Sequence, residues 1–179
     1  MRARRAARER CSADKLALLR RLAQSTLLGG LPETRVEQSW NEQVFAKLLD
    51  YRTLLSHSAL PFHVLPKNAA GARRFDDFSL GFFGLGEHTV LGTAELKSPG
   101  TDLDAPQWTG NYKGTTPVEQ ALSAARGHGA ACRWVLVSNF RELRLYDARS
   151  PDAPLATVAD LRDVRNPGSS SELGPNDLG

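Results

Sequence analysis

The sequence of 179 residues contains little cysteine and no long apolar run. Its two cysteines, Cys11 and Cys132, lie far apart and form neither a CxxC pair nor a His-containing ligand spacing, so we interpret both as reduced. No apolar stretch approaches the roughly 18–20 residues that span a bilayer, and no apolar signal-peptide core follows the basic N-terminus. These absences predict a cytoplasmic protein without a membrane-spanning segment.

A strong excess of charge of one sign is also missing, since the net charge is only +3. The distribution is nevertheless uneven, because the first ten residues contain five arginines, Arg2, Arg4, Arg5, Arg8 and Arg10. Such a cluster is usual for a solvated tail, and it also permits contact with a nucleic-acid backbone. The apolar fraction of 41% and the length fit one soluble globular domain.

Apolar periodicity and turn residues predict an alternation of helices and strands. The expected elements are a basic helix up to about residue 28, a helix from 34 or 39 to 55, a loop or short edge strand in 58–72, a hairpin of 74–83 and 89–97, a helix from Thr116-Pro117 to Gly127 or Gly129, and strands at 134–138 and 142–146. The long connection 98–115 lies between the hairpin and the last helix, and loops of that length are often functional.

This order predicts an α/β fold with a mixed central sheet flanked by helices. A right-handed crossover through the Thr116 helix would place strand 134–138 beside the strand that contains Glu95. We expect a basic helical arm in 1–37, a core in 38–148, and a largely disordered tail or linker in 149–179, where apolar residues become scarce.

The tripeptide Glu95-Leu96-Lys97 ends an apolar strand. Residues two apart in a strand point to the same face, so Glu95 and Lys97 should stand side by side while Leu96 packs on the opposite face. Asp76 and Asp77 lie in the paired strand, and periodicity does not choose which of them faces Glu95. Two carboxylates beside a lysine can hold one or two cations such as Mg²⁺. The alternative is a hairpin cap and a surface salt bridge worth about 0–1 kcal/mol.

In this order of elements the chain resembles the PD-(D/E)XK nuclease superfamily, with a restriction-endonuclease-like fold. More narrowly, three blocks are similar to the N-terminal endonuclease domain of fused (type IIG-like) restriction-modification enzymes. These blocks are residues 95–104 (ELKSPGTDLD), 116–121 (TPVEQA) and 138–146 (SNFRELRLY). The sequence departs from the superfamily pattern at two positions, because Asp76 replaces the motif proline and Ala124 stands four residues after Gln120, where some families have tyrosine.

The resemblance implies a role for each matching residue. Asp77 and Glu95 would hold Mg²⁺, and Lys97 would orient or help deprotonate the attacking water. Glu42, from the preceding helix, would be an auxiliary acid that ligates a second metal or a metal-bound water. Gln120 would steady Lys97 or contact the DNA backbone, with a simple helix-surface glutamine as the alternative.

The implied activity is that of a Mg²⁺-dependent phosphodiesterase, a DNA endonuclease that serves as the cleavage module of a restriction-modification system. Its partners would be double-stranded DNA, a methyltransferase/specificity subunit or domain, and a second copy of the chain in a homodimer. The alternative function is a non-catalytic DNA-binding or assembly module that retains the nuclease fold. The presence of Asp77, Glu95 and Lys97 together favours the enzyme.

Overall fold

The computed structural model describes residues 13–24, 33–54, 61–67, 76–84, 86–108 and 110–158. Outside these ranges lie the arginines of the first ten residues, Cys11 and the tail beyond residue 158. The sequence predictions for these residues therefore fall outside the described part of the chain. None of the helices in the described ranges is long and apolar enough to cross a membrane.

Within these ranges, six strands form one mixed sheet whose spatial order follows the chain. They are β1 (Phe62–Pro66), β2 (Phe78–Gly84), β3 (Glu87–Leu96), β4 (Trp134–Ser138), β5 (Leu143–Asp147) and β6 (Ala156–Val158). All neighbours are antiparallel except β3 and β4, which run parallel with Glu95 opposite Val137. The predicted α/β arrangement with a mixed sheet is therefore confirmed, as is the crossover that places β4 beside β3.

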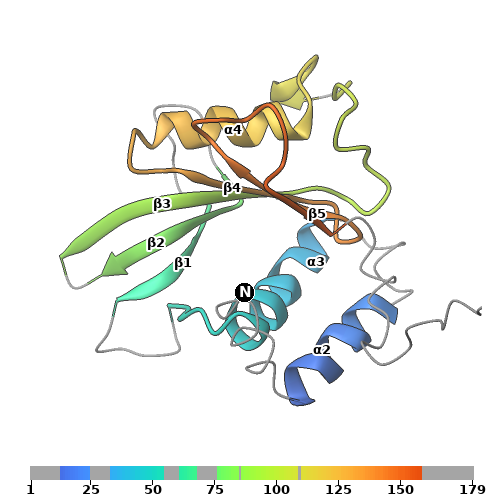
Figure 1. Ribbon diagram of the computed structural model, residues 1–179, viewed down its shortest axis with the longest axis vertical. Helices are drawn as coiled ribbons and strands as arrows, with labels where there is room; N and C mark the ends of the chain where they lie inside the picture. The colour runs from blue at the N-terminus through green and yellow to red at the C-terminus, as the bar shows by residue number, and fades with distance from the viewer. Residues whose placement is uncertain are drawn as a thin grey trace, which may run out of the picture.

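Helices cover both faces of this sheet (Figure 1). The helical elements are α2 (Ala13–Gln24), α3 (Glu33–Trp40), the π-helix η2 (Asn41–Leu48), the short 3₁₀ turn η3 (Gly110–Tyr112) and α4 (Pro117–Gly127). Helix α4 packs on β3 and β4, while α3 and η2 lie against the other face, with α2 beside η2. Helix α4 begins where the sequence predicted. Thr116 caps it, because its hydroxyl accepts from the amide of Glu119 and the Glu119 carboxylate accepts from the amide of Thr116.

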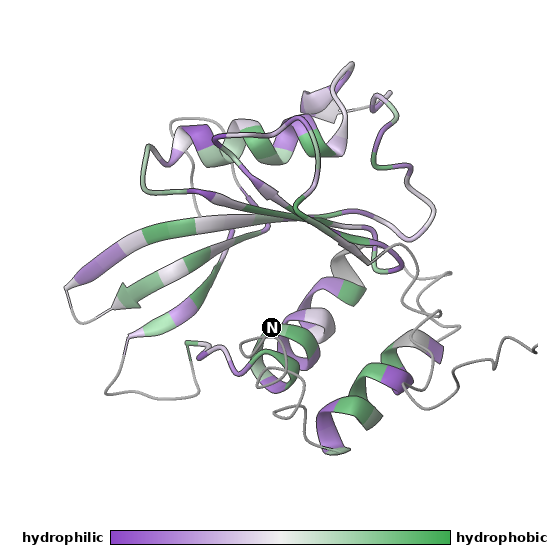
Figure 2. Cartoon of the chain, viewed as in Figure 1, coloured by the Kyte–Doolittle hydropathy of each residue, from purple (hydrophilic) through white to green (hydrophobic). Residues whose placement is uncertain are grey.

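The side chains of the central strands divide between two cores, one on each face of the sheet. Ala94 and Leu96 of β3 join the core beneath α3 and η2, while Val135 and Val137 of β4 join the core beneath α4. Apolar residues are accordingly concentrated in the middle of the sheet and along the helices that cover it (Figure 2). The alternation also turns Glu95 toward α4, which sets up the candidate site.

Segment 58–72 contains the edge strand β1, one of the two expected alternatives. Two boundaries differ from the sequence prediction. The second helix ends at Leu48 as a π-helix rather than continuing to residue 55. Part of the expected tail, residues 156–158, forms β6 against β5. A strand of three residues is too short to give a periodic signal. The β2–β3 hairpin contains an irregularity after Leu80, where a Cβ on Gly81 would lie 1.9 Å from the Thr89 carbonyl oxygen, so only glycine fits.

Candidate functional site

Glu95 and Lys97 lie side by side at the end of β3. The Lys97 ammonium donates to Oε1 of Glu95 at 2.6 Å, and the Glu95 residue is only 2% exposed. Leu96 is fully buried on the opposite face. The geometry expected from a period of two is therefore confirmed. Because Glu95 is buried and the Lys97 side chain is only 14% exposed, the pair is not the surface salt bridge that was the alternative.

Gln120 completes this group from the first turn of α4. Its side-chain nitrogen donates to Glu95 Oε1 at 2.5 Å, and its side-chain oxygen accepts from the side-chain amide of Gln107 at 2.9 Å. Gln120 is buried, so it is not a helix-surface glutamine. Its contact is with the carboxylate of Glu95, whereas the sequence had suggested Lys97 or DNA. Gln107 was missed, and its place in a long loop gives no periodic signal.

Asp76 and Asp77, which the sequence left undecided, have separate partners. Asp77 accepts from the amide of Leu96 at 2.7 Å and from the Lys67 ammonium at 2.6 Å, so its carboxylate lies at the end of β3, one residue from Glu95. Asp76 accepts from the Ser79 hydroxyl at 2.6 Å. Its carboxylate also lies 3.1 Å from Nε2 of a histidine just beyond α4. Asp77 thus contacts the backbone at the end of β3, while Asp76 lies toward α4, the helix that also contacts Glu95.

The acid expected from the preceding helix is not Glu42. The Glu42 side chain is 63% exposed and pairs with Lys47 on the same helix at 3.0 Å. Glu37 of α3 is only 12% exposed and lies 3.1 Å from the ammonium of Lys67, which also binds Asp77. Among these contacts, Glu37 is the helical acid linked to Asp77, and the expectation that Glu42 approaches Asp77 is corrected accordingly.

The sequence held a signal for this correction. Glu37 precedes the buried Trp40 by three residues, which places the two about 60° apart around the helix. Glu42 follows Trp40 by two residues and so projects from nearly the opposite side. An acid at the margin of an apolar stripe is the better candidate for an interior site than an acid opposite it.

The Lys67 ammonium pairs with the carboxylates of both Glu37 and Asp77. Partial burial would lower the pKa of its ammonium, but its bonds to Asp77 and Glu37 outweigh that effect and raise the pKa above its usual value. Lys67 follows β1 in the left-handed backbone conformation, with a φ of 48°. A lysine bound between two carboxylates marks a position with a strong preference for positive charge.

A second polar group lies under α4. Asp76, Ser79 and His128 contact one another, with 3.4 Å between the Ser79 hydroxyl and His128 Nε2. Burial, together with the negative charge of Asp76, raises the pKa of the Cys132 thiol to about 11. This group is internal to the fold, because Asp76 and Ser79 are buried.

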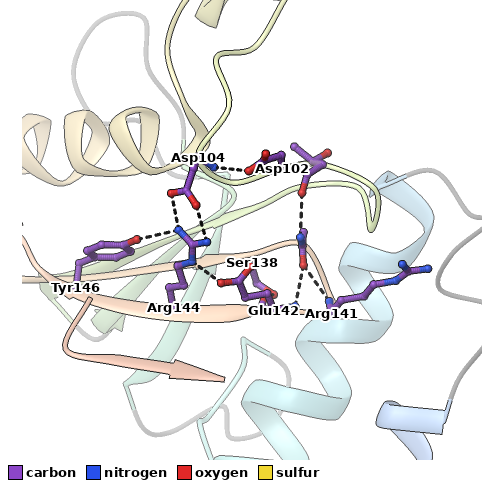
Figure 3. A network of polar contacts seen from close by, with 9 residues as sticks. Asp102, Asp104, Ser138, Arg141, Glu142, Arg144 and Tyr146 are labelled. Carbon is purple, nitrogen blue, oxygen red and sulfur yellow. Dashed lines mark hydrogen bonds and ion pairs between the residues drawn. The ribbon is translucent and has the colours of Figure 1, made fainter. Parts of the chain in front are cut away.

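The loop after Lys97 is fixed to β5 and to the β4–β5 turn (Figure 3). Arg144 donates two bonds to Asp104 at 2.6 and 2.8 Å, and it also bonds to Glu142. Asn139 donates to the Thr101 carbonyl at 2.9 Å. The bonds to Arg144 lower the pKa of the Asp104 carboxyl below its usual range. The first residues of the loop after Lys97 are therefore held in place by bonds to β5 and to the β4–β5 turn.

Comparison with protein-family models, with curated proteins and with solved structures finds no match for this chain.

Proposed function

We propose that this chain is a Mg²⁺-dependent DNA endonuclease domain of the PD-(D/E)XK type. The observation that carries the proposal is the buried Glu95 carboxylate, which is held by Lys97 just after β3 and by Gln120 from α4. The Asp77 carboxylate binds the backbone amide of the next residue, Leu96. A solvent-excluded carboxylate beside a lysine at the end of a sheet is costly to maintain, and such groups cluster at functional sites.

The donor chemistry fits a hard divalent cation. Asp77, Glu95 and Glu37 offer carboxylate oxygens, the ligands that Mg²⁺ prefers. Within the described ranges, however, no three His, Cys, Asp or Glu side chains gather closely enough to hold a metal. The Lys67 ammonium lies between Glu37 and Asp77, and its side chain is 53% exposed, so it can move away when a cation binds. We infer that Asp77 and Glu95 hold the metal, with Glu37 as the auxiliary acid.

The residues of the chain divide the remaining work. When bound, Mg²⁺ stabilises charge on the scissile phosphate and lowers the pKa of a water molecule. Gln120 fixes the orientation of Glu95, and Glu95 fixes Lys97 so that its ammonium faces the end of the sheet. Lys97 would then orient the water, or help to deprotonate it, for attack on phosphorus. The products would be a 5′-phosphate and a 3′-hydroxyl.

We place this domain in the cytoplasm as the cleavage module of a restriction-modification system, acting on double-stranded DNA. Recognition of a sequence would come from a methyltransferase/specificity subunit or domain, with or without dimerisation. The second candidate function is a non-catalytic DNA-binding or assembly module. The observation that favours this second candidate is that both Asp77 and Glu95 already have lysine partners within the described part of the chain.

The test is cleavage of supercoiled plasmid by the full chain with Mg²⁺ and with EDTA. We expect nicked and linear products only with Mg²⁺, and loss of at least about 100-fold in rate for Lys97→Ala. Lys47→Ala is the matched control, because Lys47 also pairs with a glutamate but at the exposed surface of η2. DNA binding without cleavage in Mg²⁺ or Mn²⁺ would favour the non-catalytic module. Equal cleavage by wild type and Lys97→Ala would refute the proposed site.

A further inference from the structure

Trp108 is the most exposed large apolar side chain among the described residues, with 78% of its surface accessible. Tryptophan is usually largely buried, so an indole this open indicates a surface that meets a partner. Trp108 belongs to the connection between β3 and α4, which loops out past the end of the sheet before reaching the start of α4 (Figure 1).

The base of this loop is held rigidly. The amide of Gln107 donates to the Thr115 carbonyl at 2.9 Å, and the amide of Gly114 donates back to the Gln107 carbonyl at 2.8 Å. These two bonds close a turn between Gln107 and Thr115, which is described except for residue 109. The Gln107 side chain also bonds to Gln120, the residue that binds Glu95. Trp108 therefore follows directly after Gln107, whose side chain is linked through Gln120 to Glu95 of the candidate site.

The rest of the turn is polar and offers a positive charge. A groove of about 410 Å³ separates it from the first turns of α4, and Asn111, Tyr112, Lys113 and Ser123 contribute to its lining. Lys113 is exposed, and none of the ion pairs found among the described residues involves it. The same turn thus carries an open indole and an exposed ammonium that lines a polar groove. Proteins that bind a nucleic-acid strand combine such groups, with the ring stacking on a base and the cation near a phosphate.

We propose that the turn between Gln107 and Thr115 binds a nucleic-acid strand that carries an unpaired base, with that base stacked on Trp108 and a neighbouring phosphate at Lys113. In a continuous duplex the faces of internal bases are covered by their neighbours, whereas an overhang, a flap or a single strand offers an unpaired base that can stack on the indole. The inference rests on the proposed nuclease function, and it adds that DNA with a single-stranded segment beside the cleaved bond is bound more tightly than continuous duplex.

The experiment measures binding without cleavage, using the full chain in EDTA. The probes are three fluorescently labelled DNAs with a common sequence: a single strand, a blunt duplex and a duplex with an overhang. Binding is measured by fluorescence anisotropy. We expect tighter binding to the strand and the overhang than to the blunt duplex. Trp108→Ala should weaken binding to both by about 5- to 150-fold, which corresponds to about 1–3 kcal/mol per stacked base, and should leave the blunt duplex unaffected.

Two further variants separate stacking from charge and from general damage. Lys113→Ala should weaken binding to all three probes and reduce the salt dependence by nearly one unit of slope. Trp134→Phe, on β4, is the matched control and should bind as wild type does. In that variant the remaining tryptophans are Trp40, which is buried, and Trp108, so quenching of emission by the single strand reports on Trp108.

The inference fails if Trp108→Ala binds the overhang as tightly as wild type does, or if wild type does not distinguish the overhang from the blunt duplex. Its failure is separable from that of the nuclease. Plasmid cleavage with Mg²⁺ but without an effect of Trp108 would overturn this inference alone. Overhang binding that depends on Trp108, without cleavage in Mg²⁺, would support the strand site and overturn the nuclease.

Discussion

The side-chain nitrogen of Gln120 lies 2.5 Å from Oε1 of Glu95, the same oxygen that accepts from the Lys97 ammonium. One carboxylate oxygen thus joins α4 to the end of β3 in the interior of the protein. A buried carboxylate depends on its donors, because removal of one leaves its desolvation cost uncompensated.

Replacement of Gln120 by leucine should therefore destabilise the fold. We expect the free energy of unfolding to fall by about 1–3 kcal/mol in urea denaturation, because Glu95 loses a donor and the Gln107 amide loses its acceptor. Arg126→Gln, at an exposed position of the same helix, should change stability by no more than about 0.5 kcal/mol. Wild-type stability in Gln120→Leu would mean that Glu95 is satisfied without α4.

Glu37 and Glu42 provide a second comparison. Glu37→Gln should weaken Mn²⁺ binding, measured by isothermal titration calorimetry, by about 10-fold or more, because it removes a carboxylate linked to Asp77 through Lys67. Glu42→Gln should bind Mn²⁺ as wild type does, since its carboxylate pairs with Lys47 at the surface. The opposite pattern would restore Glu42 as the auxiliary acid.

Some features of the candidate site could be predicted from the sequence. The pair of Glu95 and Lys97 follows from the period of a strand, and the start of α4 follows from Thr116 and Glu119, because both patterns involve neighbours in the chain. The choice between Asp76 and Asp77 could not be made, since both residues precede β2, where strand alternation does not hold.

The remaining contacts depend on positions that no local pattern specifies. Lys67 reaches Glu37 and Asp77 because β1 ends at that point and the backbone of Lys67 turns left-handed. Gln107 reaches Gln120 because a nine-residue turn closes between Gln107 and Thr115. Such contacts join segments far apart in sequence, so they emerge only when the strands and helices are assembled.

If a cation binds between Glu37 and Asp77 as we propose, it displaces the Lys67 ammonium from that space, so removal of Lys67 should favour metal binding. Lys67→Gly suits the left-handed backbone, and it leaves the two carboxylates facing each other without a counter-charge. We expect a higher affinity for Mn²⁺ and a larger rise in melting temperature with millimolar Mg²⁺ than in wild type. Lys47→Gly is unsuitable in a helix, so Lys47→Ala serves as the control and should show neither effect. A lower Mn²⁺ affinity in Lys67→Gly would argue against a metal at this position.

Cys132 should be an unreactive thiol at neutral pH. Its pKa is raised to about 11 by burial and by the negative charge of Asp76, so the thiolate that reacts with disulfide reagents is scarce. In a Cys11→Ser variant, labelling by a disulfide reagent at pH 8 should be on the order of 100-fold slower than in the same variant unfolded in urea. Because the folded pKa is raised, the stabilising effect of the protonated thiol is complete below the unfolded pKa of about 8.5 and is lost as pH rises toward 11. Equal labelling rates in folded and unfolded protein would contradict this.

The bonds from Arg144 to Asp104 should couple the loop after Lys97 to β5 in a pH-dependent way. We expect a double-mutant cycle of Asp104→Asn and Arg144→Gln to give a coupling energy of about 1 kcal/mol at pH 7, since the Asp104 side chain is 67% exposed and the pair is screened by solvent. The pKa of Asp104 is lowered in the fold, so the coupling is present above the unfolded pKa of about 3.9 and disappears as pH falls through the lower folded value.

The matched control for this cycle is the pair of Arg133 and Asp147, which joins β5 to the residue before β4, away from the loop. Asp104→Asn should accelerate hydrogen exchange at the amides of Thr101 and Asp104, which bond within the loop to Ser98 and Asp102, whereas Asp147→Asn should not. If the loop exchanges at the wild-type rate in Asp104→Asn, then Asn139 and the buried Leu103 suffice to hold it. In that case Arg144 stabilises β5 without holding the loop after Lys97 in place.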